Sequence, residues 1–179
     1  MLNLSGHDAH LARNTHQSLG IENLSRSQVS EMTKGLNEQV SEFRNRPLEG
    51  AVYPVLWVDA LYEKVRVDSR IVSMAVLIVC GVDESGRRDI IAVEPIAEES
   101  RDSYGVLFQS LKGHGLAIPK LVISDAHAGL VAAIRESFPG ASWQCCKVHF
   151  MRNILAYVPQ KEKKRFAAVL KEIWLAPTE

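Results

Sequence analysis

The pattern of apolar residues changes near residue 52, and this change constrains the fold more than any other feature. Before it, apolar residues recur with a helical period, and after it they gather in short runs rich in β-branched residues. Three strand-like stretches come first, and a helix, a strand, a helix and a strand follow. This order predicts an α/β layer fold with a sheet flanked by helices. A short apolar strand is expected at 53–59, a partly alternating stretch follows at 62–68, and further strands are expected at 70–80, 90–93, 120–125 and 142–148. The helices between them span 103–111 and 126–138.

The segment before residue 47 is expected to be helical. Ser25 and Gln28 have the spacing of a capping box, and apolar residues then recur every three or four positions up to Phe43. Residues 44–50 break the pattern, so we expect a helical segment at 1–46 and a second domain at 51–179. Residues 24–32 fit the turn and second helix of a helix-turn-helix, with Arg26, Ser27, Gln28 and Ser30 facing the DNA groove. A small interaction or dimerisation helix explains the pattern nearly as well.

Composition excludes several classes of protein. The 179 residues carry 21 basic and 21 acidic side chains, and 46% are hydrophobic, so neither a disordered nor a collagen-like chain is expected. Because basic and acidic side chains balance, the surface is not expected to be basic throughout, as in a general nucleic-acid-binding protein, but local basic patches are allowed. Three cysteines, two of them adjacent, favour a reducing cytosol over a disulfide scaffold. The longest apolar stretch, residues 71–80, is too short to span a membrane.

Two aspartates stand where strands are expected to end. Asp59 closes one apolar run and Asp125 closes another, and strand interiors disfavour aspartate. If the two strands are neighbours, both carboxylates meet at one edge of the sheet, where a divalent cation such as Mg²⁺ or Mn²⁺ relieves their repulsion. Such a pair suits phosphoryl transfer. The alternative is that each aspartate caps a turn or a helix, and Asp125 suits the N-cap of the helix that follows it.

Two further clusters are candidate sites. Cys146 and His149 have a spacing that allows one metal to bind both, although structural zinc needs four ligands and a buried cysteine beside a backbone-bonded histidine is the commoner outcome. The last 36 residues hold a local excess of basic side chains, which either contacts phosphates or forms a solvated helix face. The basic members are Lys147, Arg152, Lys161, Lys163, Lys164, Arg165 and Lys171.

Three ordered blocks of this sequence resemble the mutator-type transposases of bacterial insertion sequences. Residues 53–66 resemble the first catalytic block, residues 121–130 the second, and residues 143–153 the Cys-x-x-His block. The segment 44–50 also matches the segment that precedes the catalytic domain in this family. Together these matches cover roughly residues 20–179.

The resemblance implies an RNase H-like domain with a DDE metal site that uses Mg²⁺ or Mn²⁺. Asp59 and Asp125 match the first two acids, as catalytic and metal-binding residues, and Cys146 and His149 match the Cys-x-x-His pair. It implies DNA strand cleavage and joining of the 3′-hydroxyl to target DNA. The expected partners are double-stranded DNA, as terminal inverted repeats and target, and further copies of the chain, in a bacterial cytoplasm and not at a membrane. Arg26, Ser27, Gln28, Lys147 and Arg152 are the expected DNA-binding residues.

The sequence departs from the family at its end. The third acid, a glutamate, lies well beyond the second aspartate in the family, and neither Glu162 nor Glu172 matches its motif. We therefore expect a truncated copy, with an exposed apolar patch at Phe166, Leu170 and Trp174. The alternative to a transposase is a catalytically inactive module that binds DNA or interferes with a full-length partner.

Overall fold

The computed structural model describes residues 25–67, 69–96 and 98–176, and the chain divides into two compact units, residues 1–46 and 47–179. The described part of the first unit is helix α2, Arg26–Asn45. Its expected capping box is present, because the Ser25 hydroxyl accepts from the Gln28 backbone N–H and the Gln28 side chain accepts from the Ser25 backbone N–H. No residue of α2 is buried. The expectation for residues 1–20 lies outside the described residues.

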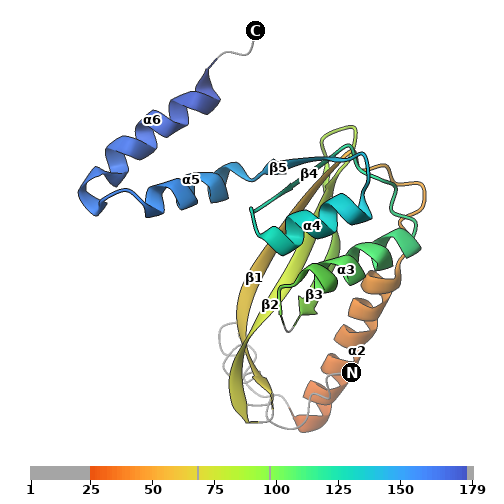
Figure 1. Cartoon of the computed structure of the whole chain (residues 1–179). Helices are drawn as coiled ribbons and strands as arrows, with labels where there is room; N and C mark the ends of the chain where they lie inside the picture. The colour runs from red at the N-terminus through yellow and green to blue at the C-terminus, as the bar shows by residue number, and fades with distance from the viewer. Residues whose placement is uncertain (1–24, 68, 97, 177–179) are drawn as a thin grey trace. The chain divides into compact units, whose positions relative to one another are not determined.

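The second unit is built on a five-stranded mixed sheet with the order β3-β2-β1-β4-β5 (Figure 1). The first three strands along the chain form an antiparallel meander, and β4 and then β5 add on the other side of β1 in parallel. The strands are β1 Val55–Val67, β2 Arg70–Val82, β3 Arg88–Ile96, β4 Leu121–Ser124 and β5 Ser142–Cys145.

Helices α3, Arg101–Gly113, and α4, Ala128–Ser137, cover the same face of this sheet (Figure 1). The strand residues Leu56, Val58 and Val122 pack beneath them. Phe108 of α3 meets Phe138, at the end of α4, with ring centroids 5.1 Å apart. The sequence order, the mixed sheet and the flanking helices confirm the expected α/β layers, in the RNase H-like arrangement that the resemblance implied.

The alternation of side chains along β1 places Asp59 on the face of the sheet that α3 and α4 do not cover. Leu56 and Val58 are buried beneath the helices, whereas Trp57, Asp59 and Leu61 are exposed. Successive side chains of a strand point to opposite faces, so these three residues lie on the face away from α3 and α4. Asp59 is therefore held on a rigid strand but remains open to solvent.

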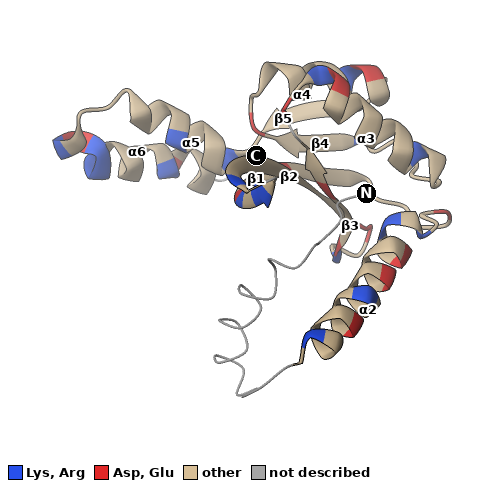
Figure 2. Cartoon of the chain, turned by 90° about the horizontal axis from the view of Figure 1, so that it is seen from below, with Lys and Arg blue, Asp and Glu red and all other residues tan. Residues whose placement is uncertain are grey.

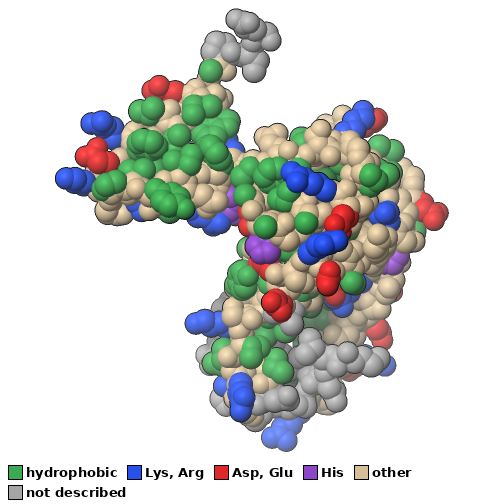
Figure 3. All heavy atoms as spheres, in the orientation of Figure 1, with side chains coloured by type: hydrophobic (Ala, Val, Ile, Leu, Met, Phe, Trp, Pro, Cys, Tyr) green, Lys and Arg blue, Asp and Glu red, His purple; other side chains and the backbone are tan. Residues whose placement is uncertain are grey.

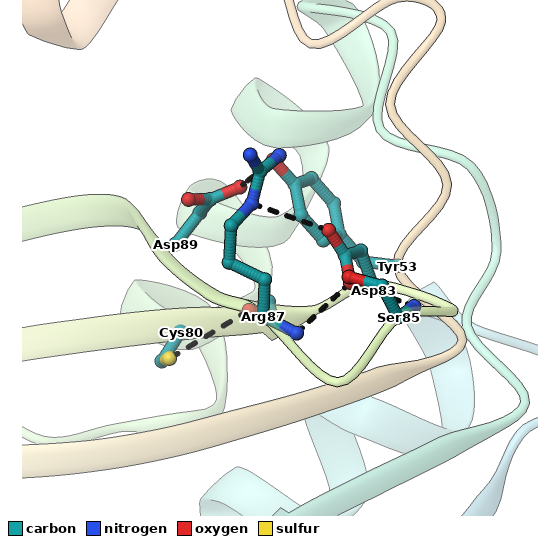
Figure 4. A network of polar contacts seen from close by, with 7 residues as sticks. Tyr53, Cys80, Asp83, Ser85, Arg87 and Asp89 are labelled. Carbon is teal, nitrogen blue, oxygen red and sulfur yellow. Dashed lines mark hydrogen bonds and ion pairs between the residues drawn. The ribbon is translucent and has the colours of Figure 1, made fainter.

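The turn between β2 and β3 is fixed by a polar network (Figure 4). The Asp83 carboxylate accepts hydrogen bonds from the backbone N–H groups of Ser85 and Arg87 and from the Ser85 hydroxyl, and it pairs with the Arg87 guanidinium at 3.3 Å. The hydrogen bond from Ser85 is the main reason that the pKa of Asp83 lies below its ordinary value. Asp89 accepts a hydrogen bond from the Tyr53 hydroxyl, which links the turn to the start of β1.

The chain ends in two helices that pack on each other, α5 Lys147–Ala156 and α6 Lys163–Leu175, with the short 3-10 helix η1 Gln160–Glu162 between them. Phe150 and Trp174 meet edge to face at 6.0 Å. The expected apolar patch is only partly correct. Phe166 is exposed but Leu170 is buried, and the exposed apolar side chains also include Val169, Ile173 and Leu175 (Figure 3).

The expected strand at 142–148 was too long. β5 ends at Cys145, and α5 begins at Lys147 rather than near residue 151. β5 pairs with β4 only from Leu121↔Ser142 to Ser124↔Cys145, so no strand partner is available further on. This shift places His149 on a helix. Within the described residues, no helix is long and apolar enough to cross a membrane.

Candidate active site

The two candidate aspartates occupy equivalent positions on neighbouring parallel strands. β1 and β4 pair from Val55↔Leu121 to Trp57↔Ile123, and each aspartate stands two residues beyond the last pair. The sequence expectation required these strands to be neighbours, and the sheet order confirms it. The expectation that Asp59 closes its strand was wrong, because β1 continues to Val67 and pairs with β2 along that length. Asp125 directly follows β4, so both aspartates lie just beyond the short segment in which β1 and β4 pair.

His149 faces the first of these aspartates. Its Nε2 lies 3.8 Å from Asp59 Oδ1, and that oxygen also accepts a hydrogen bond from the Ala60 backbone N–H at 2.9 Å. The His149 side chain is only 14% exposed, whereas that of Asp59 is 57% exposed. The imidazole thus approaches Asp59 from the protein side and leaves its second oxygen open.

Asp125 does not cap the helix that follows it, contrary to the alternative considered from the sequence. The N-cap of α4 is His127, which makes no side-chain cap bond. Asp125 Oδ1 instead accepts from the His127 backbone N–H at 3.1 Å, in a tight turn between β4 and the helix. One carboxylate oxygen orients the side chain and the other keeps its bonding capacity.

A short chain of hydrogen bonds holds the end of β4. The Trp143 indole N–H donates to the Ser124 hydroxyl at 3.0 Å, and that hydroxyl donates to the Asp125 backbone carbonyl at 2.8 Å. The Cys146 backbone N–H donates to the Ser124 carbonyl. The strand end that carries Asp125 is therefore fixed by both side-chain and backbone contacts.

Cys146 and His149 lie on one turn of helix, with Cys146 as the N-cap of α5 and His149 in its first turn. The neighbouring Cys145 is a free thiol whose pKa is raised, chiefly by burial, so it stays protonated at neutral pH. Across residues 25–67, 69–96 and 98–176, no group of three or more His, Cys, Asp or Glu side chains is arranged to hold a metal. The described residues therefore provide no set of ligands for the zinc site considered from the sequence.

Two buried imidazole nitrogens have no hydrogen-bond partner among the residues that the structure describes. They are Nδ1 of His127 and Nδ1 of His149. Unpaired buried polar atoms are uncommon and mark places where a water, an ion or a substrate group completes the structure. Hard carboxylate oxygens at Asp59 and Asp125 fit Mg²⁺ or Mn²⁺ as two of the ligands such an ion requires.

Sequence reasoning missed a further acidic residue, Glu99, which acts on the same two tyrosines as Asp125. Glu99 accepts a hydrogen bond from the Tyr104 hydroxyl at 2.5 Å, and burial followed by this bond raises the pKa of Tyr104. Glu99 also raises the pKa of Tyr62 through a hydrogen bond, and the charge of Asp125 acts on both tyrosines. The only sequence signal was the position of Glu99 four residues before the expected helix at 103–111.

The expected DNA-binding residues fall on two helices. Arg26, Ser27 and Gln28 form the first turn of α2, where Gln28 Oε1 is engaged by Ser25. Lys147 and Arg152 are exposed on α5, and the Lys147 ammonium lies 5.4 Å from the Trp174 ring centroid. Their role in DNA binding stays a prediction.

Comparison with known proteins identifies the class to which this fold and site belong. The family described as "Transposase, Mutator family" matches residues 9–178. The chain therefore belongs to the Mutator family of transposases.

Three bacterial relatives illustrate the similarity. The transposase of insertion sequence IS256 in transposon Tn4001 of Staphylococcus aureus is 44% identical over 84% of this chain and 39% of its own length. The IS1081 transposase of Mycobacterium tuberculosis is 40% identical over 90% of the chain and 39% of its own length. The ISRM5 transposase of Rhizobium meliloti is 47% identical over 76% of the chain and 34% of its own length. The chain thus spans about two fifths of the length of the first two.

Among solved structures, the HTLV-2 integrase catalytic core domain in complex with magnesium has a TM-score of 0.38 and 13% sequence identity. It covers 66% of this chain, which covers 84% of the integrase domain.

Proposed function

We propose that the region just beyond the pairing of β1 with β4, which carries Asp59 and Asp125, is part of the catalytic centre of a DNA transposase. The observation that carries this proposal is the alignment of Asp59 with Asp125 on neighbouring parallel strands, with His149 against Asp59. The reaction would be phosphoryl transfer on DNA, comprising strand cleavage and joining of the freed 3′-hydroxyl to target DNA. Membership of the Mutator family supports this choice of reaction.

Asp59 and Asp125 would hold a divalent cation, Mg²⁺ or Mn²⁺, through their free carboxylate oxygens. When bound, such an ion stabilises the charge that develops on the phosphodiester and activates the attacking oxygen. The protein's own contribution is positioning. The Ala60 and His127 backbone N–H groups each fix one carboxylate, and the half-open position of Asp59 leaves room for a phosphate.

His149 would orient Asp59 rather than react itself. Its Nε2 lies within an ion-pair distance of one Asp59 oxygen, and α5 holds the imidazole in a mostly buried position. A fixed imidazole limits the rotation of the carboxylate. This assigns a positioning role to the histidine of the Cys-x-x-His block.

The substrates would be the terminal inverted repeats of the element and a target duplex. The IS256 and IS1081 relatives are named as transposases for insertion sequence elements, which supports DNA ends as the substrate class. Arg26, Ser27, Gln28, Lys147 and Arg152 are the residues that we propose for contact with that DNA. Self-association of the chain belongs to the same proposal.

Cleavage of a labelled duplex that bears the element's own end, with Mn²⁺ present and absent, tests the proposal. We expect metal-dependent nicking that Asp59→Asn abolishes while duplex binding persists. The matched control is Glu84→Gln, which removes an exposed negative charge from the β2–β3 turn and should leave nicking unchanged.

Nicking by Asp59→Asn at the wild-type level would contradict the catalytic assignment. Duplex binding by a folded chain with no nicking under either condition would favour the alternative of a DNA-binding module without catalysis.

A further inference from the structure

The turn that carries Asp125 is packed against the start of α3. A Cβ on Gly129, in the first turn of α4, would lie 3.0 Å from the Arg101 backbone nitrogen and 3.2 Å from Cε1 of the His127 ring. The two helices lie side by side (Figure 2), and the Arg101 guanidinium pairs with the Glu136 carboxylate at 2.7 Å. The His127 ring is therefore confined on the Gly129 side, because a side chain at that position would crowd it.

Tyr104 of α3 packs on the same ring. The centroids of the Tyr104 and His127 rings are 5.8 Å apart and their planes are tilted by 59°, an ordinary geometry for an aromatic pair. Tyr104 is only 1% exposed, and its hydroxyl donates to the Glu99 carboxylate at 2.5 Å. Burial, followed by this bond, raises the pKa of Tyr104, so the hydroxyl keeps its proton at neutral pH and remains a donor.

The position of Glu99 is itself fixed by the cap of α3. The Ser103 hydroxyl donates to the Glu98 carbonyl at 2.9 Å, and the Ser100 backbone N–H donates to Ser103 Oγ at 3.0 Å. These bonds hold the residues on both sides of Glu99 against the first turn of the helix. The carboxylate is therefore a fixed acceptor for the Tyr104 hydroxyl.

The contacts around this turn connect Glu99 to Asp125. We propose that Glu99 and Tyr104 position the Asp125 carboxylate by fixing the His127 ring, an inference that rests on the proposed function of Asp125 as a metal-binding residue. The last contact is made by the backbone, since the His127 N–H donates to Asp125 Oδ1 at 3.1 Å. A fixed ring keeps this N–H aimed at one oxygen, so the other oxygen points in a constant direction. Glu99 and Tyr104 are positioning residues that act through His127.

Two other uses of these groups compete with positioning. In the first, Glu99 binds the metal directly as a third acid. In the second, the His127 imidazole binds it, since its Nδ1 is buried and has no hydrogen-bond partner in the described part of the chain. No set of three His, Cys, Asp or Glu side chains in that part is arranged to hold a metal, which favours positioning. Neither competing use requires the Tyr104 hydroxyl, so its removal separates them from positioning.

The first measurement is the hydrogen exchange of the His127 backbone N–H, followed by NMR on the full chain without metal. For Tyr104→Phe we expect exchange about tenfold faster than in the wild type, because the ring loses its fixed partner and the turn opens more readily. Glu99→Ala should give the same increase. The double variant should exchange no faster than either single variant, because both substitutions break one bond.

The second measurement is the affinity for Mn²⁺ alone, followed by electron paramagnetic resonance. Tyr104→Phe and Glu99→Ala should each weaken binding by about 3–10-fold, at or below the low end of the 10–100-fold loss typical of residues that bond a metal ligand directly. Glu99→Gln keeps an acceptor for the Tyr104 hydroxyl and should bind within about twofold of the wild type.

Two controls separate positioning from general stability. Gly81→Ala crowds the Tyr53 ring, away from this turn, and should leave both measurements unchanged, because a turn exchanges through local opening. Tyr62→Phe removes the other hydroxyl that bonds Glu99, from a side chain that is 63% exposed, and should also keep both wild-type values.

The outcomes that overturn the inference are specific. Wild-type exchange and affinity in Tyr104→Phe would do so, and so would equal changes in Gly81→Ala. A loss of affinity in Glu99→Gln as large as that in Asp125→Asn would replace positioning with direct binding of the metal by Glu99. Failure of the proposed function is distinguishable: a wild type that binds no Mn²⁺ would remove the metal site, whereas the metal-free exchange would still decide whether Tyr104 and Glu99 fix this turn.

Discussion

Individual side chains near Asp125 connect the proposed catalytic site to the core. Tyr104 is almost fully buried and packs beside the His127 ring, with centroids 5.8 Å apart. Its hydroxyl donates to Glu99, which is the acid that sequence reasoning overlooked. The same residue thus contributes to packing and to the polar environment of the site.

Tyr104→Phe should lower the free energy of unfolding by about 1.5–3 kcal/mol, because it removes a hydrogen bond to a charged group and keeps the ring. Urea denaturation followed by tryptophan fluorescence measures the change. Tyr157→Phe is the matched control, since Tyr157 is 92% exposed and should show no change. Equal stability of the two variants would mean that the Tyr104–Glu99 bond contributes nothing net.

Two glycines allow a paired prediction. A Cβ on Gly81 would lie 2.5 Å from the Tyr53 ring, so Gly81→Ala should destabilise the protein by about 1–3 kcal/mol through overpacking. Gly105 lies within α3 with open space around its Cα, and Gly105→Ala should stabilise by about 0.5–1 kcal/mol. Thermal unfolding of both variants compares them, and the same sign of change in both would contradict this description of the packing.

Part of the candidate site could be predicted residue by residue. Asp59 and Asp125 stand out because a carboxylate at the end of an apolar run is visible in the sequence itself, although β1 continues eight residues beyond Asp59, to Val67. The approach of His149 to Asp59 could not be predicted, since it depends on where α5 begins. The Glu99–Tyr104 bond depends on packing between a loop and a helix, which leaves no periodic pattern.

At the scale of elements, the β2–β3 turn gives a pH prediction. The pKa of Asp83 is lowered in the folded state, so its contribution to stability is complete above the ordinary value of 3.8 and is lost as the pH falls through the folded value. Asp83→Asn should therefore have a lower Tm than the wild type near pH 6. The difference should shrink as the pH falls below 3.8. A difference that stays constant down to acid pH would contradict this origin.

Some ends of helices and strands could be predicted from the local sequence pattern, and others could not. The capping box at Ser25 correctly predicted the start of α2, because both partners lie within four residues of sequence. The end of β5 was misplaced because its length is set by the four-residue β4 beside it. The length of the β1–β2 hairpin that no third strand flanks likewise depends on where β3 and β4 end, which the sequence of β1 or β2 alone does not predict.

At the scale of the whole molecule, the division into two units has a testable consequence. The buried core lies within residues 47–179, and it includes Leu48, which is 4% exposed and donates its backbone N–H to the His114 carbonyl. A fragment 47–179 should unfold cooperatively, with a free energy of unfolding within about 1 kcal/mol of the full chain, because α2 buries no residue.

The fragment 51–179, which begins at the boundary expected from the sequence, is the control. It lacks Leu48 and should be less stable by about 2–5 kcal/mol, the usual cost of deleting a buried leucine side chain. Guanidinium denaturation of both fragments measures the difference. Equal stability of 47–179 and 51–179 would show that Leu48 does not belong to the core of the second unit.

The central claim is that Asp59 and Asp125 bind the same divalent ion, and a Mn²⁺ titration followed by electron paramagnetic resonance tests it most directly. We expect Asp59→Asn and Asp125→Asn each to weaken binding at least tenfold, which is about 1.4 kcal/mol. The double variant should lose little more than either single variant, because one ion is shared, and Glu84→Gln should bind as the wild type does. Wild-type affinity in either single variant, or additive losses in the double variant, would contradict the shared site.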